Sequence, residues 1–183
     1  MIETIGVEGH VLVSIYERGK LIGTREGKNI WTNAGRAYLA RRMSYEQALP
    51  NVTGRPDCIL YMGVGDGNSP QVPSVTRVAN PVPYQDGVFL ADVIVPATYP
   101  TVSSVKYTRI FSDGEISLLG NTVNVSEFGL FTDGNPGLDY AAGSRVVSLA
   151  EAANQEPVAY KTVDPFPKNQ DTSFKIEWTI RFV

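Results

Sequence analysis

The stretch TSFKIEWTIRFV (residues 172–183) decides the fold class of this 183-residue chain. Its apolar side chains alternate with polar ones, which is the pattern of an antiparallel strand with one buried and one solvated face. A slip of one residue would turn the whole apolar set outward, so the pattern also predicts a firmly defined register. The predicted core face carries Phe174, Ile176, Trp178, Ile180 and Phe182.

The same period of two recurs along the rest of the chain, between clusters of Gly, Pro, Asn and Asp. The segments HVLVSIY and KLIGTR, joined by the turn-like ERGK, predict a hairpin over residues 10–25. We expect residues 1–30 to form a hairpin arm on a single domain of residues 1–183. Short strands at this spacing favour a mainly β fold, an antiparallel β-sandwich or open barrel. Further strands are predicted at CILYMGV, VFLADVIVP, SVKYTRIF, TVNVSEFGLF and SRVVSLA.

One helix interrupts this pattern, in WTNAGRAYLARRMSYEQALP. Thr32 or Asn33 can cap its start by accepting a hydrogen bond from a backbone N–H group. Good helix formers follow over about residues 34–48, and Pro50 ends the helix, which we expect to pack on the sheet. The side away from the sheet is either a solvated face or a docking patch for an acidic partner, formed by Arg36, Arg41 and Arg42.

Composition excludes several classes of function. The net charge of −3 and the pI near 5.2 lack the basic excess of a general nucleic-acid binder. Cys58 is the single cysteine and His10 the single histidine, which leaves no intrachain disulfide, cysteine-rich zinc site or two-histidine zinc site. The chain shows no secretory signal, and no apolar run approaches the ~18 residues of a membrane span. We expect a soluble protein without nucleic-acid, membrane, metal, cofactor or small-molecule partners.

The glycine-rich stretch YMGVGDGNSP (residues 61–70) resembles a ligand loop but lacks the required continuation. Its last glycine comes one position early for a dinucleotide fingerprint, prolines follow where a helix should begin, and no Lys-Ser or Lys-Thr completes a P-loop. Asp66 and Asn68 alternate as calcium ligands would, yet the later acids of a calcium loop are missing, which leaves an ion here an open question. The favoured interpretation is a strand that ends in a tight turn through Gly63, Gly65 and Gly67.

Glu127, in VNVSEFGLF, is the acid that stands out, because its neighbours two positions away are Val125 and Gly129 and its side chain is therefore expected to point inward. A buried carboxylate needs a partner or stays protonated. The pattern favours a structural salt bridge or a hydrogen bond to a turn, and it leaves open a perturbed catalytic acid. No nucleophile elbow accompanies His10, the histidine that a Ser-His or Cys-His device would need, whereas carboxylate pairs for glycoside hydrolysis depend on the fold and stay open at this point. We expect no enzyme.

The order of these motifs resembles the head-proximal domain of tail-collar fibre proteins of tailed bacteriophages and related baseplate or tail components. That pattern has a TN-x-G helix start, an apolar strand with a GxG-type turn before a proline-containing loop, and an E-x-G-L-F strand. The resemblance covers roughly residues 28–183, and no repetitive fibre shaft follows it in this sequence. The matching positions are Thr32, Asn33 and Gly35; Gly63, Gly65, Asp66 and Gly67; and Glu127, Gly129, Leu130 and Phe131.

The resemblance implies a non-catalytic structural protein of the virion, in the tail, baseplate or fibre-attachment region and assembled in the host cytoplasm. Its partners would be other virion proteins and further copies of itself. The alternatives are a decoration (cement) protein on the phage head and a carbohydrate-binding or cell-wall-degrading module. Pro- and Gly-rich stretches at residues 80–87, 133–143 and 163–171 are expected to offer subunit contacts, unless their aromatic side chains pack locally: Tyr84, Tyr140 and Phe166.

Overall fold

The structure is a computed structural model that describes residues 6–43, 59–85, 88–93, 97–116, 120–132, 149–152 and 154–183. Within these residues ten strands form one antiparallel sheet that is not closed, with strand order β4-β3-β8-β9-β2-β1-β10-β7-β6 and with β5 also paired to β3. The elements are β1 (Val7–Glu17), β2 (Lys20–Trp31), α1 (Asn33–Met43), β3 (Ile59–Gly65), β4 (Pro81–Val82), β5 (Leu90–Asp92), β6 (Thr98–Thr101), β7 (Ser104–Phe111), β8 (Val123–Thr132), α2 (Leu149–Ala152), β9 (Ala159–Lys168) and β10 (Thr172–Phe182).

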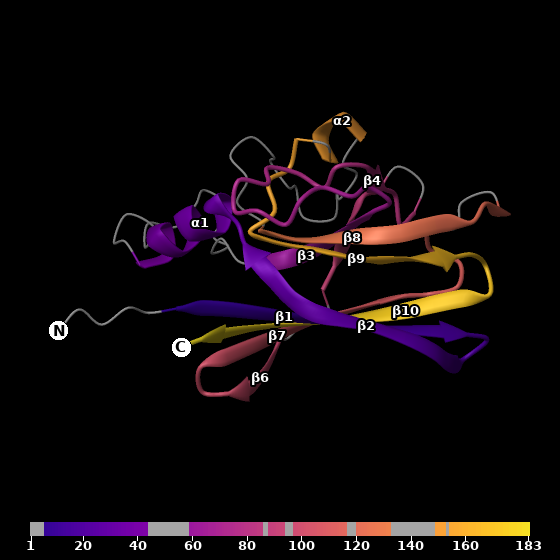
Figure 1. The fold of residues 1–183 in the computed structure, drawn as a ribbon, viewed down its shortest axis with the longest axis horizontal. Coiled ribbons are helices and arrows are strands. Elements are labelled where there is room, and N and C mark those ends of the chain that lie inside the picture. The colour runs from indigo at the N-terminus through magenta and orange to yellow at the C-terminus, as the bar shows by residue number, and fades with distance from the viewer. Residues whose placement is uncertain are drawn as a thin grey trace.

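The sheet is bent into two layers that share β2 (Figure 1). The lower layer consists of β2, β1, β10, β7 and β6, and the upper layer of β9, β8 and β3 with β4 and β5. β2 pairs with β1 over most of its length and with β9 only at Ile30 and Trp31. It therefore crosses from one layer to the other, which Figure 1 shows at the front of the molecule. The mainly β, sandwich-like class with one helix packed beside it is confirmed.

The lower layer has the alternation that its sequence predicts. β10 lies between β1 and β7, with Trp178 opposite Val11 on one side and Tyr107 on the other. Side chains of this inner face form the main core, and Trp178 is fully buried there. The predicted core face ends one residue early, because Phe182 at the end of β10 is 40% exposed.

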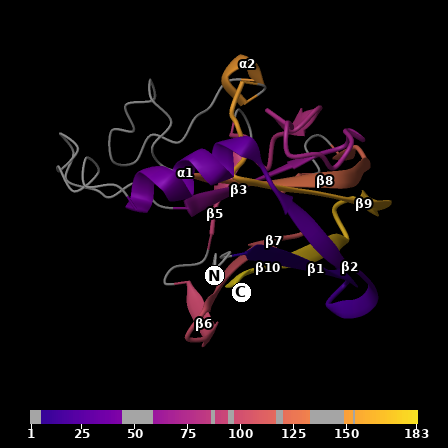
Figure 2. The same cartoon turned by 60° about the vertical axis from the view of Figure 1, so that its left-hand side comes forward.

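The upper layer is buried on both faces where β3 pairs with β8, whereas Asn124 of β8 and Asp164, Pro165 and Pro167 of β9 are exposed. Its inner face adds Met62 and Phe128 to the main core. Its outer face forms a second cluster, which includes Tyr61, Phe131 and Tyr160, with contributions from α2 and the segment between β3 and β4. Figure 2 shows α2 and this segment above β8 and β9. A sheet that is covered on both sides leaves no solvated face for its polar side chains.

The N-terminal hairpin is integrated into the sheet. β1 and β2 pair across a turn at Arg18 and Gly19, whose φ angles of 47° and 79° suit a tight hairpin connection. β1 also pairs with β10 along its whole length. The hairpin was expected as an arm, but its strands β2 and β1 form the side of the lower layer next to β10 and do not project from the fold.

Of the other sequence predictions, the start of the helix is confirmed and the strand SRVVSLA is not. Thr32 caps α1 as expected, because its Oγ1 accepts a hydrogen bond from the Gly35 N–H at 3.0 Å. The predicted end of the helix lies outside the described residues. The last two residues of SRVVSLA, Leu149 and Ala150, belong to α2 instead of a strand, and its other residues are not described. None of the described helices is long and apolar enough to cross a membrane.

Candidate functional site

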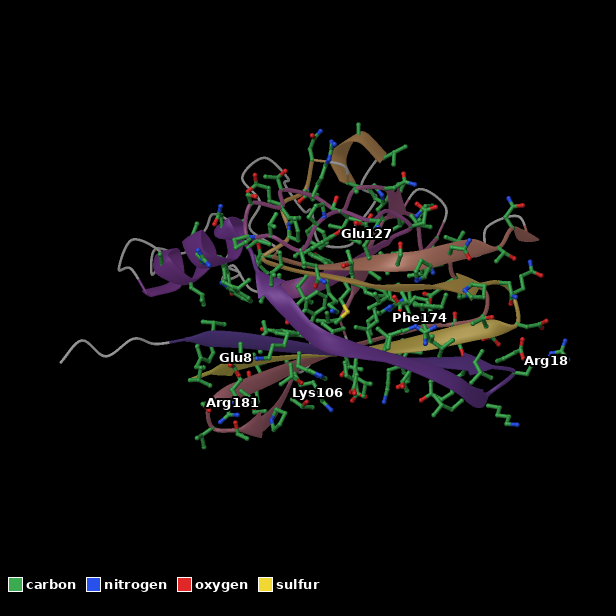
Figure 3. All side chains as sticks on the ribbon, in the orientation of Figure 1. Glu8, Arg18, Lys106, Glu127, Phe174 and Arg181 are labelled. Carbon is green, nitrogen blue, oxygen red and sulfur yellow. The ribbon has the colours of Figure 1, made fainter. Side chains whose placement is uncertain are left out.

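The candidate site is centred on Glu127 in β8, which is fully buried on the outer side of the upper layer (Figure 3). Its Oε1 accepts hydrogen bonds from the backbone N–H groups of Gly67 at 3.1 Å and Asn80 at 2.9 Å. Its Oε2 accepts a hydrogen bond from the Tyr160 hydroxyl at 2.5 Å. The carboxylate thus ties the loop that links β3 to β4 to strand β9, which confirms the hydrogen bond to a turn that the sequence favoured.

The glycines of GVGDG make this contact possible by close approach. A Cβ at Gly67 would lie 2.4 Å from Glu127 Oε1, and a Cβ at Gly65 would lie 2.6 Å from both this oxygen and the Asn80 carbonyl oxygen. Neither glycine is among the described residues with positive φ, so conformational freedom is not the reason for their presence. Ser126 adds a hydrogen bond from its Oγ to the Gly67 carbonyl at 2.6 Å. Side chains here would push the loop off the carboxylate.

A second pair of motif glycines lies directly across β3 and β8. Gly63 is paired with Gly129, and the ring of Phe131 lies over both. A Cβ would stand 2.9 Å from this ring at Gly63 and 2.8 Å at Gly129. The aromatic ring therefore fills the space that the two glycines leave open, an arrangement that stabilises glycine within a sheet. The GxG and E-x-G-L-F motifs are adjacent strands of one packed unit.

The Tyr160 hydroxyl remains a donor to Glu127 under ordinary conditions. Burial is the largest cause that raises the pKa of Tyr160, and the hydrogen bond to the Glu127 carboxylate and its charge add to the effect. Hydrogen bonds from Ser69 act in the opposite direction. Because both oxygens of Glu127 accept internal hydrogen bonds and its side chain has no exposed surface, the carboxylate holds the loop in place and has no access to a substrate.

Asp66, the candidate calcium ligand in the loop, is exposed and accepts a hydrogen bond from the Asn80 side-chain amide. The Asp66 N–H also donates to the Asn80 carbonyl at 3.2 Å. These two contacts join the beginning and end of the loop between β3 and β4. Among the described residues, no three His, Cys, Asp or Glu side chains lie close enough together to hold a metal ion.

A second polar cluster connects the two layers, and the sequence analysis did not identify it. Arg109 in β7 forms an ion pair with Glu115 at 2.5 Å, and its guanidinium lies 5.3 Å from the ring centroid of Tyr84. Lys168 at the end of β9 is fully buried and donates to the Asp113 carbonyl at 3.0 Å. Burial lowers the pKa of Lys168 to about 8, and the charges of Asp113 and Glu115 oppose this shift. The signal in the sequence was Arg109 itself, on the apolar face of a predicted strand.

The predicted contact residues differ in their exposure to solvent. Arg36 is exposed on α1, and the backbones of Arg41 and Arg42 belong to the same helix. Tyr84 is only 9% exposed and belongs to the main core. Phe166 was expected in a projecting loop, but it lies in β9 and is 2% exposed. These two aromatics pack internally and offer no contact surface, while Tyr140 and the side chains of Arg41 and Arg42 lie outside the described part of the structure.

No protein-family model, curated protein or solved structure matches this chain. The meaning of the site therefore depends on its geometry. Eight motif residues from two separated stretches of sequence meet in it or beside it: Gly63, Gly65, Asp66, Gly67, Glu127, Gly129, Leu130 and Phe131. The remaining motif, the capped start of α1, joins the same loop, because the Asn33 N–H donates to the Pro73 carbonyl at 2.7 Å and the Thr32 N–H to the Val158 carbonyl at 3.1 Å.

Proposed function

We propose that this chain is a non-catalytic structural component of a tailed phage virion, in the tail, baseplate or fibre-attachment region, where it mediates the assembly of subunits. The observation that carries the proposal is that the GxG and E-x-G-L-F motifs, on which the resemblance to tail-collar proteins rests, pack together as one architectural unit. The spacing and order of these motifs thus have a structural reason, and catalysis is not needed to explain them.

The chemistry of the site supports a structural role. Glu127 has no exposed surface and already accepts three internal hydrogen bonds. A general acid or base must reach the proton of its substrate, directly or through one water molecule. Trp178, one of two tryptophans, is fully buried and donates to Asn29, so it is not part of a sugar-binding platform. Neither observation favours the carbohydrate-binding or cell-wall-degrading alternative.

The outer strands offer features that assembly can use. β6 lies at one edge of the sheet and all four of its residues are exposed. Tyr99 in this strand is 76% exposed, and Val102 in the following turn is fully exposed. Isolated soluble proteins protect such edges, whereas a subunit that adds to a larger structure can use them as contacts.

The test is to locate the protein on purified particles of the source virus. Antibody labelling is read by negative-stain electron microscopy, and mass spectrometry of the same particles confirms the chain. We expect label at the tail or at its attachment to the head. Label over the whole head would replace the proposal with the decoration protein, and absence of the chain from particles would overturn both structural functions.

A matched test addresses the enzymatic alternative. Purified protein is incubated with host cell envelope, beside the Glu127→Gln variant, and released sugars and bound glycans are measured. We expect neither protein to release sugar or to bind glycan above the level of an unrelated protein. Release of sugar by the wild type that is lost in Glu127→Gln would contradict the structural role assigned to this carboxylate.

A further inference from the structure

The two layers separate beyond the point where β2 leaves β9. The two strands pair only at Ile30 and Trp31 of β2. Within the described part of the chain, residues 20–29 of β2 have a partner strand on one side only, and so do residues 161–168 of β9. Figure 1 shows β2 leaving β9 across the front of the molecule. We call this opening, bounded by residues 20–29 and 161–168, the β2–β9 seam.

Two cations from opposite sides of the seam point between the layers. Lys161 in β9 is opposite Phe128, a residue of the main core, and Arg25 in β2 is opposite Val13, another core residue. Residues that pair directly across antiparallel strands share a face of the sheet, so both cations lie on the core side. Arg109, the other arginine on this inner side, has Glu115 as its partner.

Neither cation has an acidic partner among the described residues. Lys161 is 9% exposed and makes no hydrogen bond or ion pair with another residue of the described ranges, and burial lowers the pKa of its ammonium group. Arg25 donates from Nη1 to the Thr24 carbonyl at 2.9 Å, but its Nε is buried without a partner. Buried charges in folded proteins are normally paired, because their removal from water is costly.

Glycines keep the seam open beside these cations. Gly23 and Gly27 lie on either side of Arg25 along the same face of β2. A Cβ at Gly27 would stand 3.0 Å from Lys161 Nζ, which places the ammonium group against the backbone of β2. A Cβ at Gly23 would stand 3.8 Å from Arg25 Nη1. The inner face of β2 thus has room and positive charge where the neighbouring strands carry apolar side chains.

The same stretch of β2 carries exposed apolar residues. Leu21 is 52% exposed and Ile22 is 56% exposed, at the end of the seam farthest from β9. A free strand edge with adjacent side-chain sites is what a protein needs to accept an extended segment as an added strand. A free phosphate ion would neutralise the cations but would leave this strand edge unused.

We propose that the β2–β9 seam accepts an extended segment of a neighbouring protein, which pairs with the free edge of β2 and directs a carboxylate to Lys161 and Arg25. The incoming acid supplies the missing partner of both cations, and charge-assisted hydrogen bonds in a site withdrawn from water are the strong ones. The inference rests on the proposed function only in taking the neighbour to be another virion subunit.

Peptide probes test the seam directly. Uniformly ¹⁵N-labelled wild-type protein is titrated with acetyl-TVTETVT-amide and with acetyl-TVTQTVT-amide, which differ only in the central charge. We expect amide signals of residues 20–29 and 161–168 to shift and the glutamine peptide to bind about tenfold more weakly, the ratio that ~1.4 kcal/mol produces. Equal affinity of the two peptides, or shifts confined to other strands, would overturn the proposal.

Two variants test whether the preference for the acidic peptide depends on Lys161 itself or on positive charge in general. Lys161→Met should bring the two peptides to equal affinity, whereas the control Lys28→Met should preserve their ratio. Lys28 belongs to β2, the other strand that bounds the seam, but its side chain is 82% exposed and lies 3.9 Å from Glu8. Lys161→Met should also fold with an unchanged or higher melting temperature, because it removes an unpaired buried charge. An unchanged peptide ratio in Lys161→Met contradicts the assignment of this residue.

Two further probes identify the source of the anion. Acetyl-TVPEPVT-amide keeps the acid but lacks two backbone N–H groups, so it should bind at least tenfold more weakly than acetyl-TVTETVT-amide. Inorganic phosphate at equal ionic strength should shift the seam signals less than that peptide does. If phosphate binds as tightly, with the same loss in Lys161→Met, the seam is a site for free anions and strand addition is wrong. These results do not depend on particle labelling, so this proposal and the proposed function can fail separately.

Discussion

The lower and upper layers are stabilised in different ways. In the lower layer, β10 alternates buried apolar side chains with partly exposed polar ones, and Glu177 meets Lys106 and Lys175 on the outer face. In the upper layer, β8 is buried over seven consecutive residues, 125–131, and two of them are Ser126 and Glu127. The polar side chains on the outer face of β10 are partly exposed to solvent, whereas Glu127 in β8 has no exposed surface and depends on internal donors.

This difference determines where the removal of a single polar group lowers the free energy of unfolding most. When a buried acceptor that serves several donors is removed, each donor is left unsatisfied. Every donor that finds no new partner costs about 1–3 kcal/mol of stability. A charged pair at the surface contributes little, because water replaces it. Figure 3 shows the contrast, with Glu127 above the upper layer, Phe174 between the layers and Lys106 on the outer side of the lower layer.

The largest expected effect comes from the apolar side of the lower layer. Trp178→Ala should lower the free energy of unfolding by ~3–5 kcal/mol, because it leaves a large cavity in the main core and removes the hydrogen bond to Asn29. Chemical denaturation measures the change. Trp178→Phe, which keeps most of the volume, should cost less, and a loss below ~1 kcal/mol in Trp178→Ala would contradict the role of this face.

The next effect tests the polar side of the upper layer. Glu127→Ala should lower the free energy of unfolding by ~2–4 kcal/mol, because the N–H groups of Gly67 and Asn80 and the hydroxyl of Tyr160 lose their acceptor. Protease cleavage within residues 66–80 should become faster, since the loop loses its attachment. If denaturation midpoints of Glu127→Ala and wild type agree, the layers do not differ in the way described.

The pH dependence of the free energy of unfolding tests the polar cluster between the two layers. The pKa of Lys168 is about 8 in the folded protein and 10.5 when unperturbed. The unfolded chain therefore holds the additional proton between these values, and the free energy of unfolding should rise with pH from about 8 to about 10.5, by on the order of 1–3 kcal/mol. Lys168→Met should lack this rise.

Tyr160 produces the opposite trend at higher pH. Its pKa is raised in the folded state, so the unfolded tyrosine ionises first and stability should fall above pH ~10. The two groups together predict a stability maximum at about pH 10, measured by denaturation at a series of pH values. Tyr160→Phe should remove the fall at high pH, and a profile that is flat from pH 7 to 11 would contradict both assignments.

The smallest effect is expected on the outer face of the lower layer. Hydrogen bonds from Lys106 and Lys175 lower the pKa of Glu177, so their contribution is present above its ordinary pKa and is lost as the pH falls. Glu177→Gln should change the free energy of unfolding by less than ~1 kcal/mol, and 1 M salt should reduce the difference. A loss as large as that of Glu127→Ala would remove the distinction between the layers.

The comparison also explains which elements the sequence could predict. β10 has one buried apolar face and one polar face, so a period of two identifies it residue by residue. β1 and β7 follow this pattern less regularly, because Leu12 and Ile110 lie on the outer face. The inward direction of Glu127 followed from the same pattern. Its backbone donors Gly67 and Asn80 lie 60 and 47 positions away in the sequence, and Tyr160 lies 33 positions away. No local sequence pattern encodes contacts across such separations.

β9 is a strand that the sequence analysis did not predict, and its residues show why. Its sequence AYKTVDPFPK contains two prolines, which argue against a strand in the interior of a sheet. From residue 161 onward β9 has a partner on one side only, and prolines are tolerated in strands with a free edge. Phe166 was consequently assigned to a loop although it packs on Phe174 in the core, with ring centroids 5.2 Å apart.

The position of β10 has a consequence for how the molecule folds. β10 follows all the other described strands in sequence, yet it is the shared neighbour of β1 and β7. During synthesis, β1 must therefore wait for a partner that lies more than 150 residues downstream, and contacts across such sequence separations make folding slow. Until then the edges of β1 and β7 that pair with β10 stay open, so the nascent chain exposes unpaired strand edges, which favour aggregation, until β10 has emerged from the ribosome.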